Sequence, residues 1–207
     1  MTRLIKAVGG VVAMTFVIGS ASGQRYIVGS EHDFSTTGWA NGEICLPCHT
    51  PHHAMAGLPR LWNHELTVAT YTMHEGTGTA VDDFDISSRL CLSCHDGTVA
   101  LDSFGGQAGT VFIGGGGLIG TDLTDDHPVG SDALYPPDPK PSWWDGAYEP
   151  ESNLPFGFLK TWEDPGAVSH QVVSCATCHT PHAAGGYDAM LVMSNNASAL
   201  CLTCHIK

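Results

Sequence analysis

Basic residues are scarce in this chain, which holds 8 Lys and Arg against 21 Asp and Glu and has a formal net charge of −13 at neutral pH. A surface this acidic repels the phosphates of nucleic acids and the headgroups of anionic lipids, so neither is an expected partner. It suits a soluble chain that meets basic proteins or metal cations.

Apolar runs long enough to cross a membrane are lacking after residue 23, so no membrane span is expected in the mature chain. Residues 1–23 have Arg3 and Lys6 ahead of a short apolar stretch and then small residues, the pattern of a cleaved secretory signal peptide. We therefore expect export, with a mature chain that begins near Gln24. An uncleaved anchor is the alternative, but the apolar stretch is short and contains Gly9 and Gly10.

Cysteine is lacking outside one short motif. All 8 cysteines lie in copies of Cys-x-x-Cys-His, at residues 45–49, 91–95, 175–179 and 201–205. Random placement of the 8 Cys and 12 His would give roughly 0.02 such motifs. Disulfides would not place a His after every second Cys, and a zinc ribbon needs none there. The motif is the signature of c-type haem attachment, in which two thiols bind the haem vinyl groups and the His binds the iron.

The sequence therefore predicts four haem c groups with their iron. The cysteines expected to bind haem covalently are Cys45, Cys48, Cys91, Cys94, Cys175, Cys178, Cys201 and Cys204. The histidines expected as proximal iron ligands are His49, His95, His179 and His205. Covalent haem attachment takes place outside the bacterial cytoplasm, which agrees with the expected export.

The motifs alternate between two kinds. CLPCHTPH at 45–52 resembles CATCHTPH at 175–182, and LCLSCH at 90–95 resembles LCLTCH at 200–205. This order predicts two dihaem modules, at residues 24–104 and 169–207, joined by a Gly-rich loop or hairpin and an irregular connection at 105–168. The chain has 25 Gly and 12 Pro, so regular structure should be sparse. We expect a mostly irregular multihaem cytochrome c, a single unit with short helices and a few small strands around four closely packed haems.

Enough histidines remain for a second axial ligand on every iron, a state suited to electron transfer rather than substrate binding. His52 and His182 each follow a proximal His by three residues and can point away toward a neighbouring haem, although His53 competes with His52. His127 is stiffened by the proline that follows it, and His32 lies near the mature N-terminus. The predicted distal ligands are His32, His52, His127 and His182. Packing or surface roles are expected for His64, His74 and His170.

Taken together, these residues resemble the exported tetrahaem c-type cytochromes with doubled CxxCH motifs, including the OmcE-type extracellular cytochromes that polymerise into conductive filaments. Besides the haem motifs, the shared segments include LWN at 61–63, CHDGTVA at 94–100 and DHPV at 126–129. The resemblance implies a continuous chain of bis-His haems and supports the four predicted distal ligands, without pairing them to haems. It does not extend to residues 134–166.

The leading interpretation is an electron carrier rather than an enzyme, working as a subunit of an extracellular filament. The last motif ends close to the C-terminus, where little chain remains to cover its haem, and His32 lies near the other end. In a head-to-tail homopolymer one subunit's His, such as His32, would cap a haem of the next, and such contacts need not close into a ring. A monomer in which His32 folds back on its own haem accounts for the same sequence.

Three further interpretations stay open. A soluble, monomeric, periplasmic tetrahaem shuttle would use the same residues. A multihaem reductase would need at least one open iron. A membrane-anchored quinol dehydrogenase would need residues 7–23 to remain as an anchor. In every case the other partners expected are redox proteins or extracellular electron acceptors.

Overall fold

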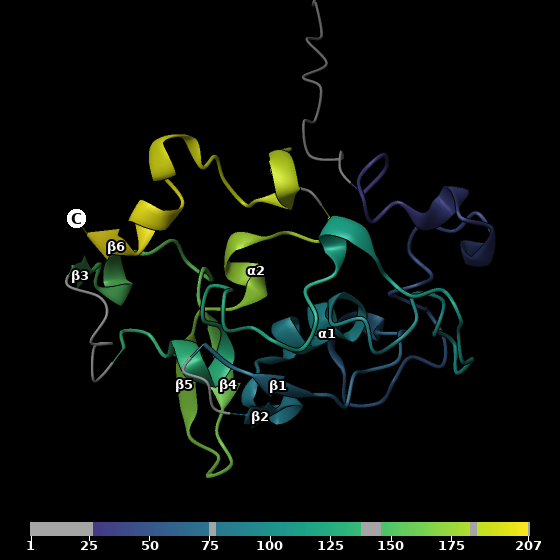
Figure 1. Ribbon diagram of the computed structural model, residues 1–207, viewed down its shortest axis with the longest axis horizontal. Helices are drawn as coiled ribbons and strands as arrows, with labels where there is room; N and C mark the ends of the chain where they lie inside the picture. Colours follow the sequence, from purple (N-terminus) through teal and green to yellow (C-terminus); the bar gives the residue numbers. More distant parts are fainter. Residues whose placement is uncertain (1–26, 75–77, 138–145, 183–185, 207) are drawn as a thin grey trace, which may run out of the picture.

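The computed structural model describes residues 27–74, 78–137, 146–182 and 186–206 (Figure 1), and the expected signal peptide lies outside them. Two α-helices are described, α1 at Ile86–His95 and α2 at Cys175–Cys178, and each carries the two cysteines of a haem motif. Three small antiparallel sheets of two strands each accompany the helices in the described part. They pair β1, Thr70–Thr72, with β2, Gly78–Ala80; β3, Ala147–Tyr148, with β6, His205–Ile206; and β4, Lys160–Glu163, with β5, Ser169–Val172.

Single 3-10 turns make up most of the remaining regular structure. They are Phe34–Thr36, Gly38–Ala40, Pro59–Leu61, Val81–Asp83, Gly115–Gly117, Gly130–Ala133, Glu151–Asn153, Asp188–Met190, Asn196–Ser198 and Cys201–Thr203. The predicted mostly irregular fold with short helices and small strands is thus confirmed for the described residues. The Gly-rich segment 105–120 is a loop with one 3-10 turn.

Local capping explains where α1 begins and ends. The Asp85 carboxylate accepts hydrogen bonds from the backbone N–H groups of Ser87 and Ser88, which would otherwise lack partners at the helix start. At the other end, Gly97 has φ +76°, a left-handed conformation that turns the chain out of the helix. A Cβ on Gly97 would also meet the Leu118 side chain at 2.6 Å, so the Gly-rich loop packs directly on this turn.

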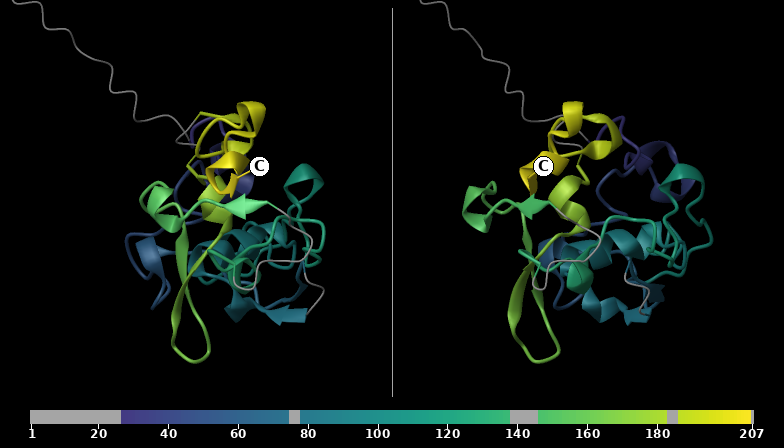
Figure 2. Two further views of the ribbon diagram at one scale, coloured as in Figure 1. Left: turned by 90° about the vertical axis from the view of Figure 1, so that its left-hand side faces the viewer. Right: turned by 60° about the vertical axis from the view of Figure 1, so that its left-hand side comes forward.

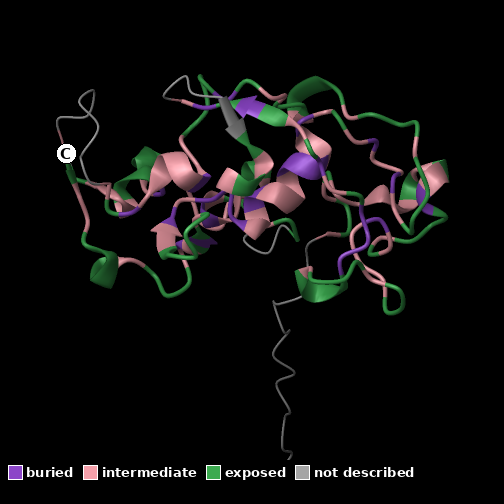
Figure 3. Ribbon diagram, turned by 90° about the horizontal axis from the view of Figure 1, so that it is seen from below, coloured by how far each residue is buried: buried purple, intermediate pink, exposed green. Residues whose placement is uncertain are grey.

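The apolar core is small. Its buried cluster consists of Tyr71, Met73, Phe84, Leu92 and Leu123, with the Tyr71 and Phe84 rings in edge contact at 5.0 Å between centres. Figure 3 shows buried residues in short stretches scattered along the chain instead of in one continuous layer. So little apolar packing among the described residues favours further apolar groups in the interior, such as the porphyrins expected from the sequence.

The β4–β5 hairpin projects away from the body, while β3 and β6 lie together at one end (Figures 1 and 2). Among the described residues, no helix has the length and apolar character needed to traverse a bilayer.

Candidate haem-binding sites

Each haem motif forms a tight turn that brings its two cysteines to one side. The backbone N–H of His49 donates to the Cys45 carbonyl at 2.8 Å, and that of His179 donates to the Cys175 carbonyl at 3.0 Å. One helical turn places residues three apart on the same face, so both thiols of a motif can reach one porphyrin edge. All 8 cysteines are free thiols. Within the described ranges, no three His, Cys, Asp or Glu side chains converge as they would around a bare metal ion.

Several of these thiols lie in apolar surroundings. Burial raises the pKa of Cys48 and of Cys178 to about 11, and that of Cys94 to about 12. Desolvation disfavours the thiolate and therefore has this sign. Burial of these sulfur atoms fits attachment to the hydrocarbon edge of a haem.

The two CHTPH segments share one backbone arrangement. Thr50 N–H donates to Leu61 O at 3.0 Å, and Asn63 N–H donates to Cys48 O at 2.9 Å. In the second module Thr180 N–H donates to Met190 O, and Val192 N–H donates to Cys178 O, both at 2.8 Å. Residues 190–192 therefore occupy the position of the LWN segment at 61–63. The two segments have different residues at every equivalent position, so sequence comparison could not find this equivalence.

Backbone carbonyls orient the proximal imidazoles. Nδ1 of His95 donates to Gly117 O at 2.6 Å, and Nδ1 of His179 donates to Ala189 O at 2.8 Å. The Arg60 carbonyl faces His49 in the equivalent place, outside hydrogen-bond geometry. A carbonyl at Nδ1 fixes the tautomer and leaves Nε2 free to bind a metal.

Two of the predicted distal histidines are oriented in the same way. Nδ1 of His32 donates to Pro181 O at 2.9 Å, and Nδ1 of His127 donates to Pro128 O at 2.8 Å. The His127 bond is local to the His-Pro dipeptide noted in the sequence. The His32 bond joins the N-terminal segment to the second module.

Three proximal histidines face a predicted distal histidine. The ring centres are 6.0 Å apart for His32 and His95, 6.2 Å for His49 and His182, and 6.2 Å for His127 and His205. A metal–imidazole bond is about 2 Å long and the ring centre lies about 1 Å further, so two imidazoles across one iron have centres roughly 6 Å apart. The three spacings therefore fit an iron held between each pair.

Burial favours the neutral form of one histidine in each of two pairs. Burial lowers the pKa of His32, and the neighbouring His95 and His182 rings lower it further, against an opposing contribution from the Pro181 carbonyl. Burial and then His127 lower the pKa of His205. Neutral imidazole is the form that binds a metal, so the folded chain favours the ligating state.

The remaining two predicted ligands are not paired. The described structure gives no ring contact for His52 or for His179, and both side chains are exposed. His52 and His53 line an open cavity of about 440 Å³, together with Leu46, Asn63 and Phe104.

Two other histidines have protein partners. His64 is 1% exposed, and its Nδ1 and Nε2 lie 2.8 Å from Glu65 O and 3.0 Å from Ala100 O. Nε2 of His170 lies 3.1 Å from the Asp164 carboxylate, on the β4–β5 hairpin. Both placements agree with the packing or surface roles expected from the sequence.

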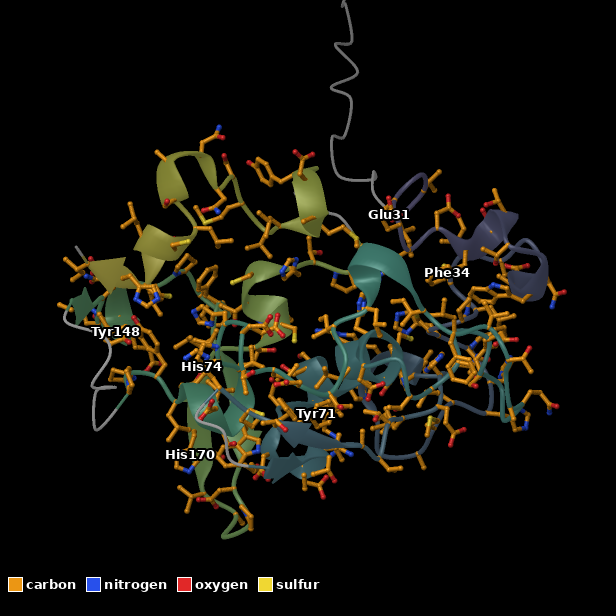
Figure 4. The ribbon with its side chains drawn as sticks, in the orientation of Figure 1. Glu31, Phe34, Tyr71, His74, Tyr148 and His170 are labelled. Atoms are coloured by element: carbon orange, nitrogen blue, oxygen red, sulfur yellow. The ribbon has the colours of Figure 1, made fainter. Side chains whose placement is uncertain are left out.

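The connection between the modules covers the C-terminal haem motif. The Tyr148 ring lies 5.1 Å from the His205 ring, and Glu149 N–H donates to Cys204 O at 2.8 Å. Figure 4 shows Tyr148 at the end of the molecule opposite Phe34. The sequence left residues 134–166 without a role and the last haem with little cover. The structure places residues 147–149 of this segment against the motif, because β3 pairs with β6.

A family model of the doubled CXXCH motif matches residues 167–207. No curated protein matches the chain. The donor set also fits: paired free thiols, an adjacent oriented imidazole and a second imidazole at the spacing of an iron site. The family match and this chemistry support a multihaem c-type cytochrome that binds haem c covalently and carries electrons.

Proposed function

We propose that the chain carries electrons through four covalently bound haem c groups, each with two axial histidines and no substrate on the iron. The observation that carries this proposal is the set of three facing His–His pairs, with ring centres 6.0 to 6.2 Å apart. Bis-His iron is six-coordinate and comparatively low in potential, so it exchanges electrons without opening a coordination position.

In this proposal, the three pairs supply distal ligands to three haems. His182 serves the motif at 45–49, His32 the motif at 91–95, and His127 the motif at 201–205. Since His49 and His182 come from different modules, their haem joins the two modules. His182 and the proximal His179 are three residues apart, which keeps the haems at 45–49 and 175–179 close together.

The haem at 175–179 receives its distal ligand from another subunit in this proposal. His182, three residues after its own motif, faces the haem of the first CHTPH segment. His52 is the equivalent residue of that first segment, and it is exposed with no ring beside it, as is His179. If His52 of one subunit serves the His179 haem of the next, the same contact repeats without closing and grows a filament. His32 is not the residue shared in this scheme, because it lies opposite His95 of its own chain.

Two alternative functions differ in how the His179 iron is completed. In a soluble periplasmic shuttle, a residue of the same chain would complete the His179 iron. In a reductase, that iron would stay open for substrate, and the exposed His179 is the observation that favours this possibility. The filament would work outside the cell and pass electrons to distant acceptors. The shuttle would serve other redox proteins in the periplasm.

Cryo-electron microscopy of the native secreted protein tests the proposal, combined with an electron paramagnetic resonance count of low-spin and high-spin haems. Filaments with four low-spin haems per subunit are expected. His52→Ala should yield separate subunits in which one haem in four loses its distal imidazole, whereas the neighbouring His53→Ala should still polymerise. Discrete particles with four low-spin haems would favour the soluble shuttle over the filament. A high-spin haem in the natural protein would instead favour the reductase.

A further inference from the structure

Asp85 is a charged residue buried at the junction of the two modules. Its side chain is 2% exposed. Oδ1 accepts hydrogen bonds from Ser87 N–H at 2.9 Å and from Ser88 N–H at 3.3 Å, and so caps α1. A buried carboxylate costs folding free energy unless its oxygens are satisfied, and two backbone bonds alone do not satisfy it.

Asp85 also accepts hydrogen bonds from two hydroxyl groups that contact α2. Ser88 Oγ donates to Oδ2 at 2.6 Å, and Ser174 Oγ donates to Oδ1 at 3.0 Å. The same two hydroxyls accept from the first turn of α2, Ser88 Oγ from Cys175 N–H and Ser174 Oγ from Ala176 N–H, both at 3.2 Å. Asp85 thus caps α1 directly and α2 through two buried hydroxyls.

This network lies where two haem motifs meet. Ser88 of α1 accepts a hydrogen bond from the Cys175 N–H at 3.2 Å, and Cys91 lies one turn after Ser88 on the same helix face. The Cys91 and Cys175 side chains are neighbours, and Asp85 lies near both. These are the first cysteines of the motifs at 91–95 and 175–179, one from each module. Haems bound at these two motifs would therefore each have an attachment point at this junction.

Apolar side chains could join two helices without the cost of burying a charge. A carboxylate with directional hydrogen bonds adds a defined register between α1 and α2. We propose that Asp85, Ser88 and Ser174 act as positioning residues, a shared cap that sets the electron-transfer contact between the haems at 91–95 and 175–179. With haems bound at both motifs, this contact would let one electron pass between them, one iron being oxidised as the other is reduced. This inference rests on the proposed electron-transfer function.

The test compares variants of the full, haem-loaded protein by redox titration and by circular dichroism in the Soret band, where coupled haems give a paired signal. Asp85→Asn removes a buried negative charge that favours ferric iron, so the midpoint potentials of two haems should rise while the other two stay unchanged. Ser174→Ala should weaken the paired signal, and Ser174→Thr, which keeps the hydroxyl, should restore it. Asp122→Asn removes an exposed carboxylate and should change neither signal.

The proposal would be overturned if Asp85→Asn raised all four midpoint potentials equally, or raised fewer than two of them. An unchanged Soret signal in Ser174→Ala would also overturn it. If the variants do not assemble, hydrogen exchange in the natural haem-loaded protein decides. The amide protons of Ser88, Cys175 and Ala176 should then exchange slowly and at similar rates. Exchange as fast as that of exposed loop amides would overturn the shared cap. If the natural protein lacked a bis-His haem spectrum, the proposed function itself would be refuted. If it had that spectrum but the variants left the potentials and the Soret signal unchanged, only the shared cap would be refuted.

Discussion

His49 and His182 face each other across the two modules, with ring centres 6.2 Å apart and the ring planes inclined by 40°. If one iron lies between them, His182→Ala removes one of its axial ligands. We expect one haem in four to become high-spin while the others stay low-spin, as measured by electron paramagnetic resonance. His170→Ala, on the hairpin, should leave the spectrum unchanged. Four low-spin haems in His182→Ala would show that His182 is not a ligand.

Replacing the same residue by methionine gives an independent check. Methionine binds haem iron and raises its potential relative to histidine. In His182→Met, the midpoint potential of one haem should therefore rise, with the other three near their natural values in a redox titration. A uniform shift of all four potentials would instead indicate a change in the fold.

His64 should stabilise the fold and should not be an iron ligand. Both of its ring nitrogens lie at hydrogen-bond distance from backbone carbonyls, and the side chain is buried. A neutral imidazole carries one N–H, so His64→Ala removes the donor from one of these carbonyls and opens a cavity, and the free energy of unfolding should fall by about 2–3 kcal/mol. Denaturant titration measures this, with Val68→Ala, at a 90% exposed side chain, as the near-neutral control. A high-spin haem in His64→Ala would contradict the packing role.

Tyr71 holds a second buried carboxylate. Its hydroxyl donates to Asp96 Oδ2 at 2.6 Å, next to the end of α1, and burial followed by this hydrogen bond raises the pKa of Tyr71. Tyr71→Phe removes a donor from a charged acceptor and should cost about 1.5–3 kcal/mol of unfolding free energy. Tyr187→Phe, at a 43% exposed ring, should cost almost nothing. Equal stabilities of the two variants would refute the role given to this bond.

The tip of the β4–β5 hairpin should respond to acid. Asp164 accepts from Val168 N–H at 2.9 Å, and this bond, followed by the one with His170, lowers the pKa of Asp164. Because the folded pKa lies below the unfolded one, the stabilisation is present above the ordinary Asp value of about 3.9 and is lost as the pH falls through the lowered pKa. The Val168 amide resonance should report this midpoint in an NMR titration. Asp164→Asn should remove the transition, and a midpoint above the ordinary value would contradict the assignment.

Much of the local structure follows from residue chemistry that acts over a few positions. The CxxCH spacing makes a turn that gathers two thiols and an imidazole, and abundant Gly and Pro limit regular elements. His127 could be singled out because Pro128 stiffens the chain beside it, and the structure adds that the Pro128 carbonyl contacts its Nδ1. These interactions need no knowledge of the rest of the fold.

The pairing of histidines could not be derived in this way. His32 reaches Pro181, and Ser174 reaches Asp85, through loops without any periodic pattern. The contact of residues 147–149 with the last motif depends on a strand pair of only two residues, too short to leave a signal in the sequence.

Neighbouring residues are enough to predict the haem chemistry, the mostly irregular fold and the candidate ligands, because covalent attachment and local turns depend on short stretches of chain. Which imidazoles face each other, how the two modules join and which histidines stay exposed became visible in the folded chain alone. Those outcomes depend on the paths of long loops, whose ends are brought together by scattered contacts between residues far apart in the chain.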